Sequence, residues 1–354
     1  MRILVTGGAG FIGSHYVRTL LGGRYPGFEH ARVTVLDKLT YAGNLASLEP
    51  VEASPRFEFV QGDICNPVLL RAVVPGHDIV INFAAETHVD RSIDGAAGFV
   101  SANVAGVHEI LNACQEADVE RVIQVSTDEV YGSVESGSWK EGEQLKPNSP
   151  YAATKAGGDL LALAWSRTHG LDVRITRCSN NYGPYQFPEK IIPLFITNLL
   201  DDVPVPLYGD GQNVREWIHV DDHCQGIQLV LERGEPGQVY HISGDVELTN
   251  AKLTEALLDC CGRGWEMVAT AADRKGHDRR YSLDDSRLRG MGYAPRIPLA
   301  EGLRDTVRWY RENRCWWEPL KAARPGGPSA APGSPGPGQA AAPGTQATVT
   351  RQAR

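Results

Sequence analysis

The sequence predicts a doubly wound α/β fold, in which a parallel sheet is followed by a smaller, mixed C-terminal lobe. Two observations support this prediction. Short apolar runs alternate with helical segments through residue 180, which is typical of parallel strands joined by crossover helices. A glycine-rich turn links the first apolar run to the first helical segment, and such turns gather backbone amides at the carboxyl end of a strand.

The apolar runs locate the strands of the expected sheet, and the helical periods locate its helices. Strands are expected at residues 2–6, 32–36, 57–60, 78–84, 121–126 and 172–176. Helices are expected near residues 11–22, 66–73, 99–117 and 150–169. Ligands of such sheets bind at the carboxyl ends of the strands, so the residues that follow each strand are candidates for a site.

Composition divides the chain into three parts. Residues 1–180 carry the alternation of strands and helices, whereas residues 181–321 are irregular and richer in Pro, Gly and Arg, which favours a smaller lobe. Of the 33 residues 322–354, 21 are Ala, Pro or Gly and none is aromatic. We therefore expect this tail to be disordered.

Charge and composition narrow the classes of function. The chain is 42% hydrophobic and 22% charged, as in a soluble globular enzyme, and its net charge of −8 argues against a nucleic-acid partner. No apolar run reaches 18 residues, and the N-terminus enters a strand at once, so neither a membrane span nor a signal peptide is expected. Seven cysteines without a Cys-x-x-Cys pair indicate reduced thiols in a cytoplasm.

The turn after the first strand reads Gly7-Gly8-Ala9-Gly10-Phe11-Ile12-Gly13. Gly7, Gly10 and Gly13 permit a tight turn, a close approach of the backbone to a ligand, and close packing of helix on strand. The amides at the start of the following helix suit a pyrophosphate. The turn therefore predicts a Rossmann-type site for a dinucleotide.

An acidic residue, Asp37, ends the second strand, 24 residues beyond Gly13. Its carboxylate can accept hydrogen bonds from an adenosine ribose and would repel a 2′-phosphate, so NAD is favoured over NADP. The next residues are Lys38-Leu39-Thr40. The cation of Lys38 counts against this preference without reversing it.

Tyr151 and Lys155 are spaced so that a helix places the phenol and the ammonium on one face, one turn apart. The cation would stabilise a phenolate, which would let Tyr151 act as a base below its free pKa of about 10. The alternative is an exposed pair on the surface of a helix.

Thr127-Asp128-Glu129 follows the fifth strand. Two adjacent carboxylates can supply an acid and a base at one site, although acidic pairs after strands also occur as solvated turns. Hydride transfer alone needs no such pair. Oxidation coupled to proton abstraction and loss of water does.

Together these motifs resemble the extended short-chain dehydrogenase/reductase family and, within it, the dTDP-glucose 4,6-dehydratases. The resemblance runs from residue 1 to about residue 320, and Thr127-Asp128-Glu129 is its most discriminating part. It implies NAD as a tightly bound cofactor that is recycled within each turnover. The residues that it assigns to the cofactor are Gly7, Gly10, Phe11, Ile12, Gly13, Asp37, Lys38, Leu39, Thr40, Asp63, Ile64, Phe83, Ala84, Ala85, Tyr151, Lys155, Cys178 and Asn181. Asp63 would contact the adenine, or cap the helix that begins near Asn66-Pro67.

The same resemblance implies a nucleotide-sugar site in the lobe of residues 181–321. Arg215 matches a diphosphate-binding arginine, a role that suits the forked guanidinium. The substrate-binding residues that it implies are Thr87, Thr127, Asn180, Lys190, Pro206, Tyr208, Arg215, Asn250, Arg274 and His277. His88 has no second His or Cys at ligand spacing, so we expect it to position a loop, and no metal is expected.

The implied reaction is a dehydration in deoxysugar biosynthesis, catalysed by a lyase. Tyr151, supported by Lys155, would remove the proton of the sugar 4-hydroxyl as hydride leaves C4, and Thr127 would hydrogen-bond the 4-oxygen. Glu129 would then take the C5 proton and Asp128 would protonate the departing 6-hydroxyl, before hydride returns to C6. The expected product of dTDP-glucose is dTDP-4-keto-6-deoxyglucose. Whether it supplies a cell-surface polymer or a natural-product glycoside stays open.

Several other functions share parts of this pattern. A UDP-glucose 4,6-dehydratase would differ by one methyl group on the base, worth only about 1–3 kcal/mol. Nucleotide-sugar 4-epimerases do not need both carboxylates, and glucuronate decarboxylases usually have Ser where Asp128 stands. A non-catalytic NAD-binding protein would be expected to lose Tyr151 and Lys155.

The helices expected near 99–117 and 150–169 are apolar on more than one face. The apolar residues are Val104, Val107, Ile110 and Leu111 in the first, and Leu160, Leu161, Leu163, Ala164 and Trp165 in the second. One face must cover the sheet, so the surplus indicates a homodimer through a four-helix contact, as the family commonly uses. The alternative is a buried helix pair in a monomer.

Overall fold

A seven-stranded parallel sheet forms the centre of the molecule. The computed structural model describes residues 1–273 and 276–322. The strand order is β10-β6-β5-β4-β1-β2-β3, and all neighbours are parallel. The strands are β1 (Arg2–Thr6), β2 (Arg32–Asp37), β3 (Phe57–Gln61), β4 (Ile79–Asn82), β5 (Arg121–Thr127), β6 (Val173–Cys178) and β10 (Val239–Ile242). The predicted doubly wound fold is confirmed, and the strand order reverses between β1 and β4.

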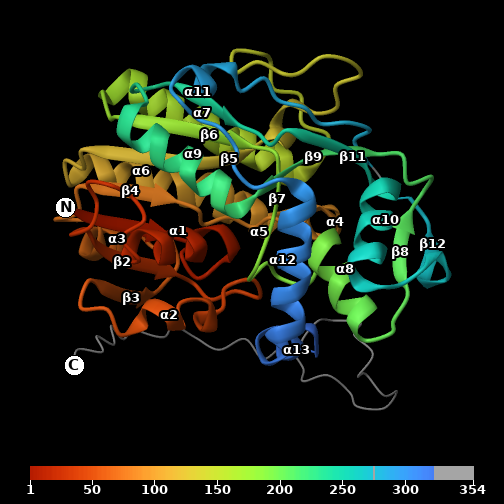
Figure 1. Cartoon of the computed structure of the whole chain (residues 1–354). Coiled ribbons are helices and arrows are strands. Elements are labelled where there is room, and N and C mark those ends of the chain that lie inside the picture. The colour runs from red at the N-terminus through yellow and green to blue at the C-terminus, as the bar shows by residue number, and fades with distance from the viewer. Residues whose placement is uncertain (274–275, 323–354) are drawn as a thin grey trace, which may run out of the picture.

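Helices cover both faces of this sheet (Figure 1). One face carries α1 (Phe11–Leu21) and α9 (Val220–Arg233), and the other carries α3 (Pro67–Val73), α6 (Gly106–Glu116) and α7 (Pro150–His169). Successive side chains of a strand point to opposite faces, so Ile3 and Val5 enter the first core and Leu4 enters the second. Burial on both faces explains why the strands read as continuous apolar runs.

Shorter segments complete this part of the chain. They are η1 (Leu45–Ser47), α2 (Glu49–Glu52), α4 (Val89–Asp94), α5 (Ala97–Val100), the π-helical turn η2 (Ser101–Ala105) and the 3-10 turn η3 (Asp128–Tyr131). The single helix expected at 99–117 therefore consists of α5, η2 and α6.

The second lobe has a core of its own beside the large sheet. It contains a three-stranded sheet of β7 (Asn180–Tyr182), β9 (Val214–His219) and β11 (Val246–Thr249), and a pair of β8 (Val205–Tyr208) and β12 (Val268–Ala271). The remaining helices are α8 (Ile191–Leu200), α10 (Asn250–Cys261), η4 (Trp265–Met267), α11 (Ser286–Gly290), α12 (Leu299–Glu312) and α13 (Arg314–Ala322). Because β9 pairs antiparallel with β11 and parallel with β7, this lobe is mixed, as predicted.

Two predicted boundaries differ from the structure. Strand β10 joins the large sheet beside β6, so the chain returns to the first sheet after residue 180 and the division at that residue does not separate the sheets. Ala322 ends α13 and is not part of a tail. The other residues of the predicted disordered tail, 323–354, lie outside the described residues.

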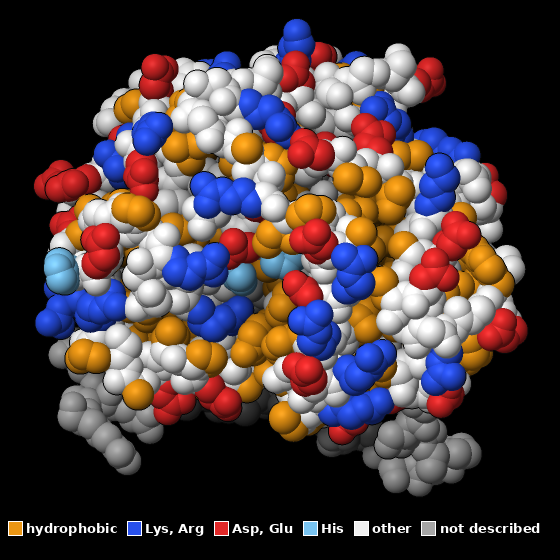
Figure 2. Space-filling model, in the orientation of Figure 1, with side chains coloured by type: hydrophobic (Ala, Val, Ile, Leu, Met, Phe, Trp, Pro, Cys, Tyr) orange, Lys and Arg blue, Asp and Glu red, His pale blue; other side chains and the backbone are white. Residues whose placement is uncertain are grey.

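The surface mixes charges of both signs. Cationic and anionic side chains are interspersed over the face drawn in Figure 2. Among the described residues, no helix is long and apolar enough to cross a membrane.

Candidate functional site

A cavity of about 560 Å³ follows the carboxyl ends of the central strands and extends into the second lobe. All residues predicted to bind the cofactor line it, except Leu39. All residues predicted to bind substrate line it as well, except Arg274, which lies outside the described residues. The fold therefore gathers at one cavity residues that are more than 200 positions apart in the chain, such as Gly7 and His277.

The glycine turn forms one end of this cavity. Gly7 has a φ of 68°, and a Cβ at this position would lie 2.5 Å from the amide nitrogen of Ala84. A Cβ at Gly13 would lie 2.4 Å from the carbonyl oxygen of Gly7, so α1 can pack against β1 only with glycine there. Gly10 caps α1 without a side-chain hydrogen bond, and the first turn has no acidic residue. The amides of this helix start fit a pyrophosphate.

Asp37 lies at the end of β2 on the cavity wall. Its Oδ2 accepts a hydrogen bond from the amide of Ala9 (2.9 Å), and its Oδ1 accepts one from the amide of Leu39 (2.8 Å). Burial raises the pKa of Asp37, and these two bonds oppose the rise. Each oxygen retains a lone pair that suits a ribose hydroxyl.

The structure adds two details near Asp37. Leu39 does not line the cavity, because its side chain packs against the core and only its amide supports Asp37. Asp63 does not cap α3. The side chain of Asn66 caps this helix instead, because its Oδ1 accepts hydrogen bonds from the backbone amides of Val68 and Leu69.

Lys38 and Asp63 form an ion pair in which Nζ and Oδ2 are 2.7 Å apart. This ion pair engages Lys38, the cation that follows Asp37 in the chain and that could otherwise attract a 2′-phosphate. We predict that the protein binds NAD at least about tenfold more tightly than NADP, because Asp37 would face the extra phosphate. Calorimetry with each cofactor measures this ratio. Equal dissociation constants would remove the assigned role of Asp37, and Asp37→Asn should reduce the preference.

The acidic pair begins η3, directly after β5. The hydroxyl of Thr127 donates to Oδ1 of Asp128 (3.1 Å) and accepts the amide of Glu129 (3.3 Å), which fixes the turn. Asp128 is only 2% exposed, and its Oδ2 has no hydrogen-bond partner among the described residues. The alternative prediction, that the acidic pair lies in a solvated turn, is therefore wrong for Asp128.

The environment of Asp128 keeps its proton in place. Burial, followed by the charge of Glu129, raises the pKa of Asp128 to about 8, while Thr127 and Arg215 oppose the shift. A carboxyl group with such a pKa is still protonated near neutral pH and can act as a general acid.

This pKa predicts the alkaline side of the pH–rate profile. An acid with a raised pKa is protonated below that value and loses its proton above it. We therefore expect the rate of water loss to fall as the pH rises through about 8. Steady-state rates across this range measure the effect, and a rate that stays level well above pH 8 would contradict it.

Tyr151 and Lys155 lie in the first turns of α7, whose start is capped by Ser149. They are 7% and 6% exposed, so they are not a surface pair. The ammonium of Lys155 donates to the carbonyl oxygen of Val125 (2.6 Å). Burial lowers the pKa of Lys155, and the carboxylate of Asp159, one turn further along α7, opposes this change.

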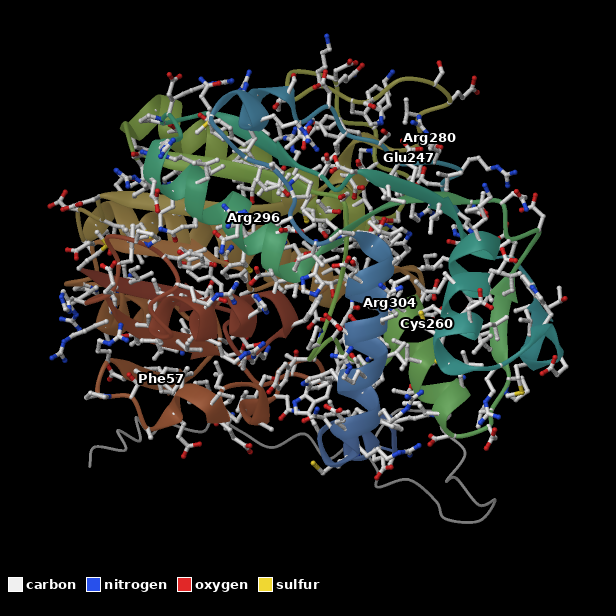
Figure 3. All side chains as sticks on the ribbon, in the orientation of Figure 1. Phe57, Glu247, Cys260, Arg280, Arg296 and Arg304 are labelled. Atoms are coloured by element: carbon white, nitrogen blue, oxygen red, sulfur yellow. The ribbon has the colours of Figure 1, made fainter. Side chains whose placement is uncertain are left out.

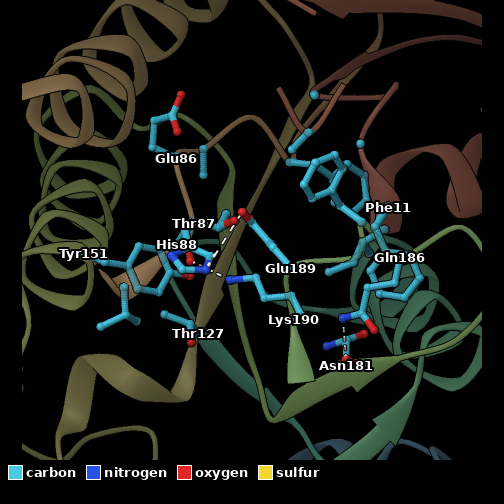
Figure 4. Close-up of a pocket in the computed structure, with 18 of the residues that line it drawn as sticks. Phe11, Glu86, Thr87, His88, Thr127, Tyr151, Asn181, Gln186, Glu189 and Lys190 are labelled. Atoms are coloured by element: carbon cyan, nitrogen blue, oxygen red, sulfur yellow. Dashed lines mark hydrogen bonds and ion pairs between the residues drawn. The ribbon is translucent and has the colours of Figure 1, made fainter. Parts of the chain in front are cut away.

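The predicted lowering of the Tyr151 pKa is not seen. Burial, followed by the charge of Glu129, raises the pKa of Tyr151 well above its usual range, and a hydrogen bond with Thr127 opposes the rise. The ammonium of Lys155 is directed to the backbone of β5. The side chains of Tyr151 and Thr127 lie next to each other in Figure 4.

The second lobe supplies polar groups to the other end of the cavity. The guanidinium of Arg215 lies 4.3 Å from the ring centre of Tyr281 and donates to the carbonyl oxygen of Asp278 (2.9 Å). Oδ1 of Asn180 is buried and has no hydrogen-bond partner among the described residues. An unpaired acceptor on a cavity wall suits a sugar or ribose hydroxyl. Pro206, Tyr208, Asn250 and His277 line the same end.

Two ion pairs hold the segment that carries His277 and Tyr281. Nδ1 of His277 lies 2.6 Å from Oδ1 of Asp273. Arg280 and Glu247 lie together at the upper right in Figure 3, with a closest separation of 2.6 Å. The second pair joins this segment to β11.

Sequence reasoning missed a polar bridge between α4 and the loop before α8. Glu189, from the loop before α8, lies 3.1 Å from the guanidinium of Arg91 and 3.9 Å from Nε2 of His88. Its neighbour Lys190 donates to the carbonyl oxygen of Thr87 (2.9 Å). Figure 4 shows the contact of Glu189 with His88 and that of Lys190 with Thr87. His88 also accepts the amide of Arg91, in agreement with its predicted role in positioning the loop. The sequence could have indicated a role for Glu189 because it directly precedes Lys190, which was predicted to bind substrate.

Known proteins resemble the chain over most of its length. The family model described as GDP-mannose 4,6 dehydratase matches residues 4–306. A dTDP-glucose 4,6-dehydratase from Streptomyces antibioticus is 59% identical over 339 residues, which cover 95% of this chain and 100% of that protein. A dTDP-glucose 4,6-dehydratase from Streptomyces venezuelae, solved with NAD bound, is 62% identical with a TM-score of 0.90, and the match covers 91% of this chain and 100% of that one.

More distant structures have the same architecture with another activity. A UDP-glucose 4-epimerase from Thermus thermophilus, solved with NAD, has a TM-score of 0.81 at 30% identity, and the match covers 88% of this chain and 100% of that one. The fold alone therefore does not separate dehydration from epimerisation. The side chains beside Tyr151 have to make that distinction.

Proposed function

The chain belongs to the GDP-mannose 4,6 dehydratase family and, within it, to the dTDP-glucose 4,6-dehydratases, and on this basis we propose that it converts dTDP-glucose to dTDP-4-keto-6-deoxyglucose and water. The observation that carries this proposal is a buried carboxyl group, Asp128, whose pKa is raised to about 8 beside a second carboxylate and Tyr151. An epimerase has no use for a protonated acid at this place.

The cofactor site fits NAD. The glycine turn, the open start of α1 and Asp37 are placed to hold the pyrophosphate and the adenosine ribose. When bound, NAD would supply reversible hydride transfer between C4 and C6 of the sugar, and its positive charge would favour a phenolate nearby. Lys155 is placed to hold a hydroxyl of the bound cofactor or substrate once its bond to Val125 is exchanged.

The other side chains at the site act on the substrate in turn. Tyr151 takes the proton of the 4-hydroxyl, and Thr127 holds the 4-oxygen. The resulting ketone makes the C5 proton acidic enough for Glu129 to remove. Asp128 gives its proton to the 6-hydroxyl, which leaves as water, and Glu129 then returns its proton to C5. Arg215 and Lys190 bind the diphosphate, and Asn180 contacts the sugar.

A direct assay tests the reaction. Protein loaded with NAD is incubated with dTDP-glucose, and the mixture is made alkaline, where a 4-keto sugar absorbs. We expect a chromophore that grows with time, and a much smaller signal with UDP-glucose at the same concentration. Recovery of the substrate unchanged, or as its 4-epimer, would contradict the proposal.

We further infer that the protein is cytoplasmic, since all seven of its cysteines are free thiols in the structure. Its product supplies deoxysugar biosynthesis.

We also propose that the protein is a homodimer through α6 and α7. Leu160 is 58% exposed on α7 and Val100 is 50% exposed on α5, whereas Val107, Ile110 and Leu111 are buried within the chain. Light scattering should give a mass well above 38.5 kDa, and a mass near that value would contradict the dimer. Leu160→Arg should shift the mass towards the monomer. Leu45→Arg, at another exposed site (46%) on η1, should not.

A further inference from the structure

The proposed reaction leaves the catalytic protons in the wrong places at its end. Glu129 takes a proton from C5 and returns it to C5, so its balance is zero. Tyr151 keeps the proton of the former 4-hydroxyl, whereas Asp128 has given its proton to the departing water. One proton must therefore move from Tyr151 to Asp128 before the next turnover.

The structure places one hydroxyl between these two groups. On one side the side chain of Tyr151 lies next to that of Thr127 (Figure 4), and the hydroxyl of Thr127 opposes the rise of the Tyr151 pKa. On the other side Oγ1 of Thr127 donates to Oδ1 of Asp128 at 3.1 Å. The oxygen is held in this position because it also accepts the amide of Glu129 (3.3 Å). A hydroxyl that accepts one hydrogen bond and donates another can pass a proton along the chain.

The direction of this chain matches the proton that has to move. After product forms, Tyr151 is a phenol that can donate to Thr127, and Asp128 is a carboxylate that can accept from it. Before turnover, when the positive charge of bound NAD favours a phenolate at Tyr151, the order is reversed, since Thr127 can then donate to the phenolate and accept from the carboxyl group. Both states keep all three groups hydrogen-bonded.

Burial limits the alternative path through solvent. Tyr151 and Thr127 are each 7% exposed and Asp128 is 2% exposed, and a bound sugar in the cavity would cover them further. The only other oxygen of Asp128, Oδ2, is the one left for the substrate, since it has no partner among the described residues.

We propose that the Thr127 hydroxyl returns the proton from Tyr151 to Asp128 after each turnover, an inference that rests on the proposed dehydration. The Oη–H bond of Tyr151 breaks as an O–H bond forms on Thr127 Oγ1. The original Oγ1–H bond of Thr127 breaks as one forms on Asp128 Oδ1. One proton is carried in net terms, no electron changes place, and Thr127 is unchanged at the end.

Comparison of Thr127→Val with Thr127→Ser tests the relay. Valine keeps the shape of threonine and removes the hydroxyl, whereas serine keeps the hydroxyl. Resting enzyme equilibrates with water before mixing, so its first turnover begins with Asp128 protonated even in the valine variant. We expect rapid-quench experiments on this variant to show one fast turnover, followed by a steady state at least about tenfold slower. The slow phase should be slower still in D₂O.

The controls separate this relay from the other roles of Thr127. The parent and Thr127→Ser should not show this drop between the first turnover and the steady state, which excludes slow product release as its cause. If the first turnover and the steady state of Thr127→Val fall equally, Thr127 serves only the 4-oxygen and the relay is wrong. If Thr127→Val does not fold, as judged by NAD content, Thr127→Ala carries the same test. A parent enzyme that forms no 4-keto product would overturn the proposed function instead.

Discussion

Replacement of Asp128 by Asn together with Glu129 by Gln is expected to lower turnover by about 10²–10⁴-fold, the usual contribution of general acid–base catalysis. Each carboxamide keeps the shape of the carboxyl group and loses its titrating proton. Oxidation at C4 needs neither group, so the variant should still bind NAD and dTDP-glucose. Mixing it with substrate should produce a lasting absorbance of the reduced cofactor without release of water.

Stopped-flow absorbance and the alkaline assay measure these two effects on the same sample. Glu135→Gln is the matched control, since Glu135 is an exposed carboxylate in the following loop and its loss should leave turnover unchanged. If the double variant dehydrated its substrate within about tenfold of the parent rate, the acid–base roles given to the pair would be wrong.

Replacement of Tyr151 by Phe should stop the reaction one step earlier. Without the phenol no group is placed to take the proton of the 4-hydroxyl, and we expect turnover to fall by about 10²–10⁴-fold. Unlike the double carboxamide variant, this variant should show no reduced cofactor on mixing with substrate. The affinity for dTDP-glucose should change little.

Tyr293→Phe is the control for the loss of a buried phenol. Its hydroxyl donates to the carbonyl oxygen of Ser243 (3.2 Å), and it belongs to the core on the α1 face of the sheet. That variant should lose some stability and keep its activity. Appearance of reduced cofactor in Tyr151→Phe at close to the parent rate would remove Tyr151 from the first step.

The large sheet could be predicted where its strands are buried on both faces. Runs such as Ile3-Leu4-Val5 supply apolar side chains to both cores, so their signal is strong. Strand β10 was missed because it has only four residues, two of which are Tyr240 and His241. Its pairing with β6 depends on long-range tertiary packing, which the local sequence pattern does not indicate.

The sequence predicted which residues line the cavity. It predicted their hydrogen-bond partners and pKa shifts less well. The order of residues along the chain locates Asp128, Tyr151 and Lys155 at the ends of β5 and the start of α7. It does not give the hydrogen-bond partner of Lys155, which proved to be the backbone of Val125. For the same reason the bridge of Arg91 and Glu189 and the supporting role of Leu39 appear only in three dimensions.

The central claim is that one site oxidises C4, removes water across C5 and C6, and reduces C6 with the same hydride. The most direct test uses dTDP-glucose that carries deuterium at C4, followed by mass and NMR analysis of the product. The expected product is a 4-keto sugar nucleotide that is lighter by one water and carries the deuterium at C6. Deuterium that stays at C4 in a sugar that has kept its 6-hydroxyl would contradict it and would identify an epimerase.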